Sequence, residues 1–377
     1  MPAAHLFNYP ELHTTCVQKI KRMPKGSAHT GRLPDGCVLC EKGAKLVLLV
    51  TGKCARKCWY CPLSAEKRGK NVFFANERKV SDVSEVIDEA ELMDALGTGV
   101  TGGDPLEAID RTVDCIKSLK KRFGKRHQIH LYTSSTDANK IRRVAKAGLD
   151  EIRFHPPMGL WKRLEKTEFA KAAALSKKLG MKVGLELPVI PGKTDDLVSA
   201  ISFADVAKLD FVNLNELEFS ETNWRSLREL GFDTKKDNDI SSGVSGSEEL
   251  ALNLLHLETD IPLHYCSSAF KDGVQLRRRI MRRARNVARP HEILTRDGTL
   301  LKGVIETDRI AMTAAWIMKT FDVPGRLIWG DYKKNRLEIA PWVLEEIADE
   351  LEPPAYIVEE YPTADRLEVE RTPLKRR

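Results

Sequence analysis

The stretch KLVLLVTGKCARKCWYC, residues 45–61, decides the fold. Its apolar first half predicts a β-strand. Cys54, Cys58 and Cys61 follow directly after that strand. Three thiolates so close together can hold an iron–sulfur cluster, but four thiolates normally complete a cubane. The spacing therefore predicts a cluster that keeps one iron open for a small molecule.

Short β-rich runs continue along the chain and alternate with longer helical patterns. Such alternation predicts βαβ units and a parallel sheet. The helical segments 111–123 and 137–148 each end near a glycine, as helices commonly do. We therefore expect an α/β fold with six strand–helix units, whose strands lie at residues 45–50, 95–101, 128–134, 150–155, 182–188 and 210–216.

The spacing C-x3-C-x2-C, with Tyr60 just before the last cysteine, resembles the signature of the radical S-adenosylmethionine (radical SAM) enzymes. The resemblance covers roughly residues 45–270 and extends to the archaeal-type proteins related to pyruvate formate-lyase activating enzyme. It implies a partial (βα)6 barrel, a [4Fe-4S] cluster on the three cysteines, and S-adenosylmethionine on the open iron. It also implies an electron donor such as a ferredoxin or flavodoxin, and a 5′-deoxyadenosyl radical that abstracts hydrogen.

A second motif, Gly102-Gly103-Asp104-Pro105, ends the next expected strand. It resembles the family's Gly-Gly-Glu-Pro segment, in which glycines let the backbone approach the methionine ammonium of the cofactor. Asp104 is one methylene shorter than the usual glutamate, so the backbone role is the firmer expectation. As an isolated string the motif is typical of an ordinary turn. Its place after the cysteines favours cofactor binding.

Polar residues at the ends of later strands are further candidates for cofactor binding. In a barrel of this kind the chemistry lies at the C-terminal ends of the strands. We expect hydroxyl groups there to bond the ribose, and Arg153 to pair with the cofactor carboxylate, since an arginine in an apolar strand needs an anionic partner. The alternative for each is a satisfied polar group at a strand end. The candidates are Thr133, Ser134, Ser135, Arg153, His155, Glu186 and Asn213.

Four other cysteines suggest a second metal site. Cys37 and Cys40 form a C-x2-C pair just before the first strand, and this spacing is typical of half a zinc or iron–sulfur site. Further potential ligands are available in His13, Cys16, His264 and Cys266. The alternative is a set of buried or free thiols, as we expect for Cys115 in its amphipathic helix.

Residues 271–289 carry seven arginines and one lysine against one aspartate. A helix with this charge can bind the phosphate backbone of RNA. The alternative is a connecting helix whose arginines pair with the acidic segment that follows. Both interpretations remain open at this point.

The pattern divides the chain into four parts: an N-terminal extension (1–44), the barrel (45–270), the basic helix (271–289) and a small α+β domain (290–377). The last part shows no metal or phosphate motif, so substrate docking or a lid over the barrel is its expected role. No stretch approaches about 20 consecutive apolar residues, and the N-terminus lacks the features of a signal peptide. We expect a cytoplasmic protein without membrane contact, where free thiolates can be kept for metal.

Three functions fit the sequence. The first two are radical SAM enzymes: one that activates or modifies a protein, and one that modifies tRNA with the basic helix holding the backbone. The third is a non-catalytic interaction protein whose cysteines bind zinc. The glycine-rich motif and the barrel pattern count against the third.

Overall fold

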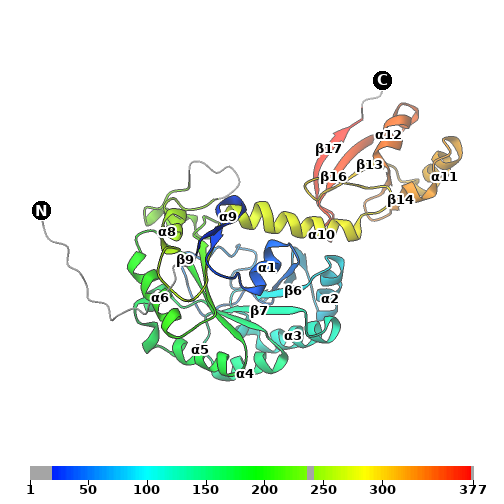
Figure 1. Ribbon diagram of the computed structural model, residues 1–377. Helices are drawn as coiled ribbons and strands as arrows, with labels where there is room; N and C mark the ends of the chain where they lie inside the picture. Colours follow the sequence, from blue (N-terminus) through cyan, green and yellow to red (C-terminus); the bar gives the residue numbers. More distant parts are fainter. Residues whose placement is uncertain (1–18, 236–241, 375–377) are drawn as a thin grey trace, which may run out of the picture.

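A curved sheet with seven parallel strands forms the larger part of the protein, in a computed structural model that describes residues 19–235 and 242–374. Six of these strands are the expected ones, so the α/β barrel predicted from the sequence is confirmed (Figure 1). In spatial order the parallel strands are β3 (Lys45–Leu49), β6 (Gly97–Thr101), β7 (Gln128–Thr133), β8 (Glu151–Phe154), β9 (Lys182–Val189), β10 (Phe211–Glu216) and β11 (Leu263–Cys266).

The seventh strand, β11, extends the six that the sequence predicts. The barrel stays partial, because short antiparallel strands, rather than a contact between β3 and β11, flank the parallel set in the described residues. These flanking strands are β1 (Lys21–Arg22) and β2 (Ala28–His29) beside β11, and β4 (Phe74–Ala75) and β5 (Arg78–Lys79) beside β3.

Helices cover the convex face of the sheet (Figure 1). Because strand side chains alternate between the two faces, Leu46 and Leu48 join the hydrophobic core while Lys45 and Val47 point into the barrel. Cys115 is fully buried in that core, as expected. The helices are α2 (Val83–Leu92), α3 (Ile109–Phe123), α4 (Ala138–Ala147), α5 (Glu168–Lys178) and α6 (Thr194–Val206).

Helix α1 (Asp35–Glu41) packs across the N-terminal ends of β3, β6 and β7 and closes that end of the barrel. Its close approach depends on Gly36. A Cβ atom there would lie 2.5 Å from the His130 ring and 2.8 Å from the Arg153 guanidinium. Only glycine fits at this contact, and it allows α1 to present Cys37 and Cys40 to the barrel interior.

The remaining elements of the barrel part are short. Helix α7 (Trp224–Glu229) and helix α8 (Ser247–Leu254) follow β10. Single 3₁₀ turns are η1 (Pro24–Gly26), η2 (Pro105–Ala108) and the longer η3 (Met158–Lys166). After β11, helix α9 (Ser268–Phe270) runs into a π-helix, η4 (Lys271–Leu276).

Helix α10 (Arg277–Val287) continues from the π-helix and leads to the C-terminal domain (Figure 1). Six of the seven arginines of 271–289 form ion pairs. In the described residues four pairs join the helix to residues that precede it and two reach residues that follow it, so the acidic C-terminal segment supplies only part of the pairing that the second interpretation expects. The pairs are Arg278–Glu41, Arg279–Glu77, Arg282–Asp94, Arg283–Glu89, Arg277–Asp297 and Arg289–Glu338.

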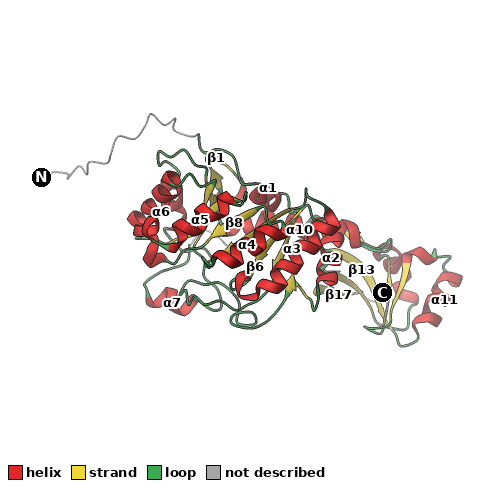
Figure 2. Cartoon of the chain, turned by 90° about the horizontal axis from the view of Figure 1, so that it is seen from below, coloured by secondary structure: helices red, strands yellow, loops and turns green. Residues whose placement is uncertain are grey.

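The C-terminal domain is an antiparallel sheet with two helices, and it lies at the far end of α10 (Figure 2). This agrees with the α+β domain expected from the sequence. No helix in the described ranges is long and apolar enough to span a membrane. The order of strands in the sheet is β14 (Ile328–Asp331), β15 (Arg336–Ile339), β13 (Leu300–Glu306), β16 (Ala355–Glu360) and β17 (Glu368–Pro373), and β12 (Ile293–Leu294) also pairs with β13. The helices of the domain are α11 (Ile310–Thr320) and α12 (Pro341–Ile347). Its 3₁₀ turns are η5 (Gly325–Leu327) and η6 (Ala348–Glu350).

Candidate active site

A cavity of about 900 Å³ occupies the concave side of the sheet, and all seven parallel strands contribute to its lining. The loop that carries Cys54, Cys58 and Cys61 lines one end, next to Gly102 and Gly103. Cys37 and Cys40 of α1 line the opposite end. Both groups of cysteines therefore face the same internal space.

The cysteine loop follows the C-terminal end of β3, where a barrel of this type carries its chemistry. Cys54 is exposed, whereas Cys58 and Cys61 are half-buried. Four basic side chains line the same end of the cavity and can offset the negative charge of three thiolates. They are Arg56, Lys57, Lys67 and Arg68.

Residues from the segment after β10 hold this loop in place. The Asn223 side-chain amide, which is fully buried, donates a hydrogen bond to the Tyr60 carbonyl at 3.1 Å. The Thr222 hydroxyl donates to the Cys61 carbonyl at 3.2 Å, and Trp59 stacks on Phe232. No local sequence pattern indicates these anchors, because they contact the loop from about 160 residues away.

Tyr60 connects the cysteine loop to the end of β8. Its ring is buried, and its hydroxyl lies 3.2 Å from Nε2 of His155. Burial raises the pKa of Tyr60, so the hydroxyl stays protonated and can donate this hydrogen bond. Two of the predicted site residues are thus brought together in the cavity lining.

Gly102 and Gly103 are crowded by the protein itself. A Cβ atom on Gly103 would lie 2.3 Å from the Lys53 carbonyl oxygen and 2.6 Å from that of Gly52. The Gly103 amide donates to the Thr51 carbonyl at 2.7 Å. The glycines therefore allow the approach of the segment that enters the cysteine loop, in addition to any approach of a cofactor.

Asp104 organises the end of β7 instead of facing the cavity. Its carboxylate accepts hydrogen bonds from the Thr133 hydroxyl at 2.7 Å and from the Ser134 amide and hydroxyl at 2.9 and 3.0 Å. It also accepts one from the Leu106 amide. The hydroxyl protons expected to bond a ribose are thus engaged by Asp104. Thr133 and Ser134 line the cavity, whereas Asp104, Pro105 and Ser135 are outside its lining.

Arg153 has protein partners where a cofactor carboxylate was expected. Its guanidinium pairs with Glu151 at 2.5 Å and with Glu186 at 3.4 Å, and it lies over the ring of Tyr132. The anionic partners of this buried arginine are Glu151 of its own strand β8 and Glu186 of the neighbouring strand β9. Burial opposes its charge, yet Cys37 and the carboxylates raise the pKa of Arg153 above its usual value.

Glu186 joins three strands inside the barrel. It accepts hydrogen bonds from the side-chain amides of Asn213 at 2.9 Å and Asn215 at 2.7 Å. The Asn213 oxygen in turn lies 3.1 Å from Nδ1 of His264. The predicted candidates Glu186 and Asn213 are therefore parts of one hydrogen-bonded chain that ends at His264.

Three of the four cysteines proposed for a second metal site line the cavity near α1: Cys37, Cys40 and Cys266. Gln275 of the π-helix bridges two of them, with its side-chain oxygen 3.1 Å from the sulfur of Cys40 and its nitrogen 3.5 Å from that of Cys266. Burial raises the pKa of Cys266 to about 12. Cys16 and His13 lie outside the described residues.

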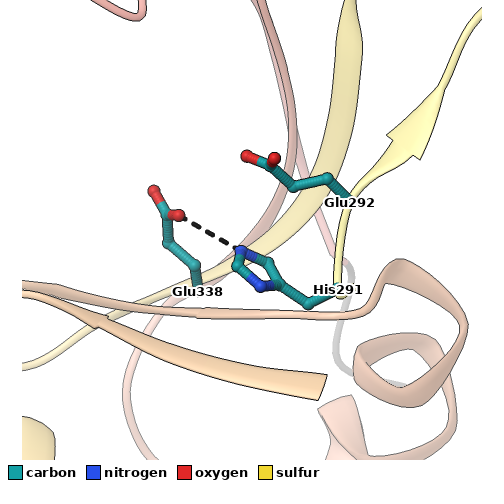
Figure 3. Close-up of side chains that lie close together, drawn as sticks. All are labelled: His291, Glu292 and Glu338. Atoms are coloured by element: carbon teal, nitrogen blue, oxygen red, sulfur yellow. Dashed lines mark hydrogen bonds and ion pairs between the residues drawn. The ribbon is translucent and has the colours of Figure 1, made fainter. Parts of the chain in front are cut away.

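A buried charged cluster in the C-terminal domain also contains potential metal ligands. His291, Glu292 and Glu338 place one ligand atom each within 4.8 Å of one another, and His291 points toward Glu338 (Figure 3). However, the Lys302 ammonium already contacts Glu292 at 3.1 Å and Glu338 at 3.0 Å. Arg336 pairs with Glu338 as well. The carboxylates are compensated by protein cations, so this cluster is a structural ion-pair network.

Comparisons with known proteins agree with the cysteine motif and the barrel. Residues 48–204 match the family model of the radical SAM superfamily, and residues 298–374 match a "Domain of unknown function (DUF8061)". A protein of Methanocaldococcus jannaschii named "Putative glycyl-radical enzyme activating enzyme MJ0021" is 40% identical over 360 residues, which cover 91% of this chain and 93% of that protein.

Solved structures match this chain with lower sequence identity and over a smaller part of its length. SuiB from Streptococcus suis has a TM-score of 0.41 at 12% identity, over 60% of this chain and 49% of SuiB. Methylornithine synthase (PylB) has a TM-score of 0.39 at 13% identity, over 56% of this chain and 60% of that enzyme. The family assignment depends instead on the family model and on the relative that matches nearly the whole chain. The chain belongs to the radical SAM superfamily of enzymes.

Proposed function

We propose that Cys54, Cys58 and Cys61 hold one [4Fe-4S] cluster and that the protein uses it to cleave S-adenosylmethionine. The observation that carries this proposal is the position of the three thiols. They line one cavity, at the C-terminal ends of the barrel strands, on a loop fixed from outside by Asn223 and Thr222. Three thiolates leave one iron of a cubane without a protein ligand.

The surroundings fit such a cluster. Burial raises the pKa of the Cys54 thiol, and thiols must be deprotonated to bind metal. The basic side chains at this end of the cavity place positive charge near the three cysteines. Once bound, the cluster and S-adenosylmethionine together supply one electron, a broken sulfur–carbon bond and a 5′-deoxyadenosyl radical that abstracts hydrogen. The protein's own groups position this chemistry. Asp104 fixes Thr133 and Ser134 at the cavity wall, and Tyr60 links the loop to His155.

We further propose that the hydrogen atom comes from another protein. The name of the relative from M. jannaschii describes an enzyme that activates glycyl-radical enzymes, and 40% identity along nearly the whole chain supports a substrate of the same class. The ion pairs of α10 also favour this choice over RNA. Arginines already paired with carboxylates are poorly placed to neutralise phosphates as well.

Cofactor cleavage tests the first part. The anaerobically reconstituted protein, given dithionite and S-adenosylmethionine, should form 5′-deoxyadenosine, and Cys54→Ala, Cys58→Ala or Cys61→Ala should reduce this to background. Cys115→Ala is the matched control, since that thiol is buried in α3 away from the cavity. Product formation by a Cys58→Ala protein at the wild-type rate would rule out the assignment.

Salt dependence separates the two substrate classes. If the basic helix bound single-stranded RNA, log affinity would fall with log salt concentration on a slope of about −0.7 per phosphate contact. We expect weak RNA binding that does not change when Arg278, Arg282 and Arg285 are exchanged for glutamine. A steep slope that flattens by about two units in this variant would favour RNA as the substrate.

A further inference from the structure

The closed end of the cavity gathers sulfur and nitrogen ligands that cofactor cleavage does not use. Cys37 and Cys40 reach it from α1, and His264 and Cys266 reach it from β11. Residues of a single strand that differ by two lie on the same face. Four potential soft-metal ligands, from two elements more than 200 residues apart in the sequence, therefore face one space.

The hydrogen bonds around His264 leave Nε2 of its ring with a free lone pair, as a metal ligand requires. Glu186 accepts from the Asn213 nitrogen, which turns the Asn213 oxygen toward Nδ1 of His264. Nδ1 must then carry the proton, and Nε2 must present its lone pair. His264 is only 3% exposed, and its Nε2 has no hydrogen-bond partner in the described part of the chain. Orientation of a histidine by an outer hydrogen bond is typical of metal ligands.

Buried positive charge surrounds the same cysteines. Lys45 is 7% exposed and lines the cavity, and its ammonium lies near His130 and the Tyr132 ring, with no carboxylate in an ion pair with it in residues 19–235 or 242–374. Among the residues that the structure describes, its ammonium has one hydrogen-bond partner, Nε2 of His130 at 3.2 Å. The Arg153 guanidinium lies 3.4 Å from the sulfur of Cys37. A buried ammonium without a carboxylate is costly, but an anionic metal–thiolate centre would compensate for it.

The spacing of the ligand atoms counts against a single metal ion. A tetrahedral zinc with bonds of about 2.3 Å would bring its sulfur ligands within about 4 Å of one another. In the described part of the chain, only the His291 trio has three ligand atoms within 4.8 Å. This spacing is found neither for Cys37, Cys40 and Cys266 nor for the three cysteines of the loop after β3. A cubane instead places each ligand on a different iron atom, so its ligands can stand farther apart.

The segment that crosses this end of the cavity can adjust. Gln275 bonds both Cys40 and Cys266 and belongs to a π-helix, a rare conformation that is frequent at functional sites. Its side chain is neutral and flexible, so it can turn away from the two sulfur atoms. Helix α1 is fixed by the contact of Gly36 with His130 and Arg153.

We propose that Cys37, Cys40, Cys266 and His264 bind a second iron–sulfur cluster at the closed end of the barrel. Three thiolates and one imidazole complete the four ligands, and imidazole ligation of cluster iron is known chemistry. Such a cluster has no open iron. It therefore does not bind S-adenosylmethionine, in contrast to the cluster proposed for Cys54, Cys58 and Cys61.

Iron and acid-labile sulfide counts on the full-length protein test this inference. After anaerobic reconstitution we expect about eight iron atoms per wild-type chain, and about four in each of two triple variants. The variants are Cys54→Ala/Cys58→Ala/Cys61→Ala and Cys37→Ala/Cys40→Ala/Cys266→Ala. The Cys115→Ala control should match the wild type.

The first triple variant keeps the test decisive even if the second one misfolds, since its substitutions lie in a loop outside the regular elements. If that variant holds no iron–sulfur cluster, or binds zinc instead, the inference is overturned. Because the readout is metal content, it separates this inference from the proposed function. A wild-type protein that fails to cleave S-adenosylmethionine contradicts the proposed function but not the second cluster.

The histidine ligand has its own test. In the variant without Cys54, Cys58 and Cys61, the reduced cluster should show hyperfine coupling to nitrogen in pulsed electron paramagnetic resonance (EPR). His264→Ala should abolish the coupling, while His264→Cys should retain four iron atoms without it. Strong nitrogen coupling that persists in His264→Ala would exclude His264 as the ligand.

Discussion

The barrel cavity and the core of the C-terminal domain both bury lysines, arginines and glutamates, but they satisfy them differently. In the C-terminal domain, Lys302 contacts three carboxylates, those of Glu292, Glu338 and Glu360. In the cavity, Lys45 has no carboxylate partner in the part of the chain that the structure describes, and His264 leaves one ring nitrogen unbonded. Both lysines are almost fully buried.

This difference separates a structural cluster from a functional one. A buried charge is costly unless it is paired and hydrogen-bonded. The C-terminal network pairs its charges internally, so it needs no ligand to account for it. In the described residues the cavity keeps a lysine without a carboxylate partner, thiols whose hydrogen-bond partners include Gln275 and Arg153, and a histidine nitrogen without a partner. We propose that the thiols and the histidine bind metal.

The largest expected effect is on the stability of the C-terminal network. Lys302→Met removes the ammonium that three buried carboxylates share, although each keeps an arginine partner, so we expect a loss of about 3–5 kcal/mol. Hydrogen exchange at the amides of β13 and β16 measures this loss locally. Lys45→Met is the matched variant in the barrel. It orphans no carboxylate and should change the stability of the metal-free protein by less than about 1 kcal/mol.

An equal loss in the two lysine variants would break the comparison. It would mean that Lys45 has a structural partner as strong as those of Lys302. A loss confined to Lys302→Met would support the division of the molecule into a paired and an unpaired region.

Helix α10 allows a second comparison along one surface. Arg283 is buried and pairs with both oxygens of Glu89, whereas Arg285 is exposed. Arg283→Gln should therefore cost about 3 kcal/mol in urea unfolding, since it leaves a buried carboxylate. Arg285→Gln should change stability by less than about 0.5 kcal/mol. Comparable losses at both positions would mean that overall charge, and not pairing, determines the role of the helix.

Replacing Asp104 tests whether its carboxylate supports the cofactor site indirectly, by holding other residues of the cavity wall in place. Asp104→Ala removes the acceptor for four hydrogen bonds, three of them from Thr133 and Ser134. We expect a loss of about 2 kcal/mol in stability and weaker binding of S-adenosylmethionine, measured by calorimetry on the reconstituted protein. Unchanged stability with weaker binding would instead indicate that the carboxylate contacts the cofactor directly.

The sequence predicted the six strands and the cysteine loop because both are local patterns. A strand is recognisable from its own residues, and C-x3-C-x2-C lies within eight positions. What it could not predict depends on distant pairs. Strand β11 has no β-rich run of its own and is defined by its register with β10. Glu186 reaches Arg153 from β9, and Asn223 reaches Tyr60 from the segment after β10.

The smallest effect is the response of the C-terminal network to acid. Burial alone would raise the pKa of Glu338, but hydrogen bonds from His291 and Lys302 hold it well below its usual range. A depressed folded-state pKa gives stability that is present above pH 4.5 and is lost as the pH falls below it. The slope should be up to about 1.4 kcal/mol per pH unit for each proton taken up. An opening free energy of the β15 amides that stays constant between pH 5 and 3, after correction for the pH dependence of intrinsic exchange, would contradict this coupling.

The central claim is that the Cys54, Cys58 and Cys61 cluster presents an open iron to S-adenosylmethionine. EPR spectra of the reduced, anaerobically reconstituted protein, recorded with and without S-adenosylmethionine, test it most directly. We predict that the cofactor shifts the cluster signal in the wild type and equally in the variant that lacks Cys37, Cys40 and Cys266. Identical spectra with and without saturating S-adenosylmethionine would contradict the account.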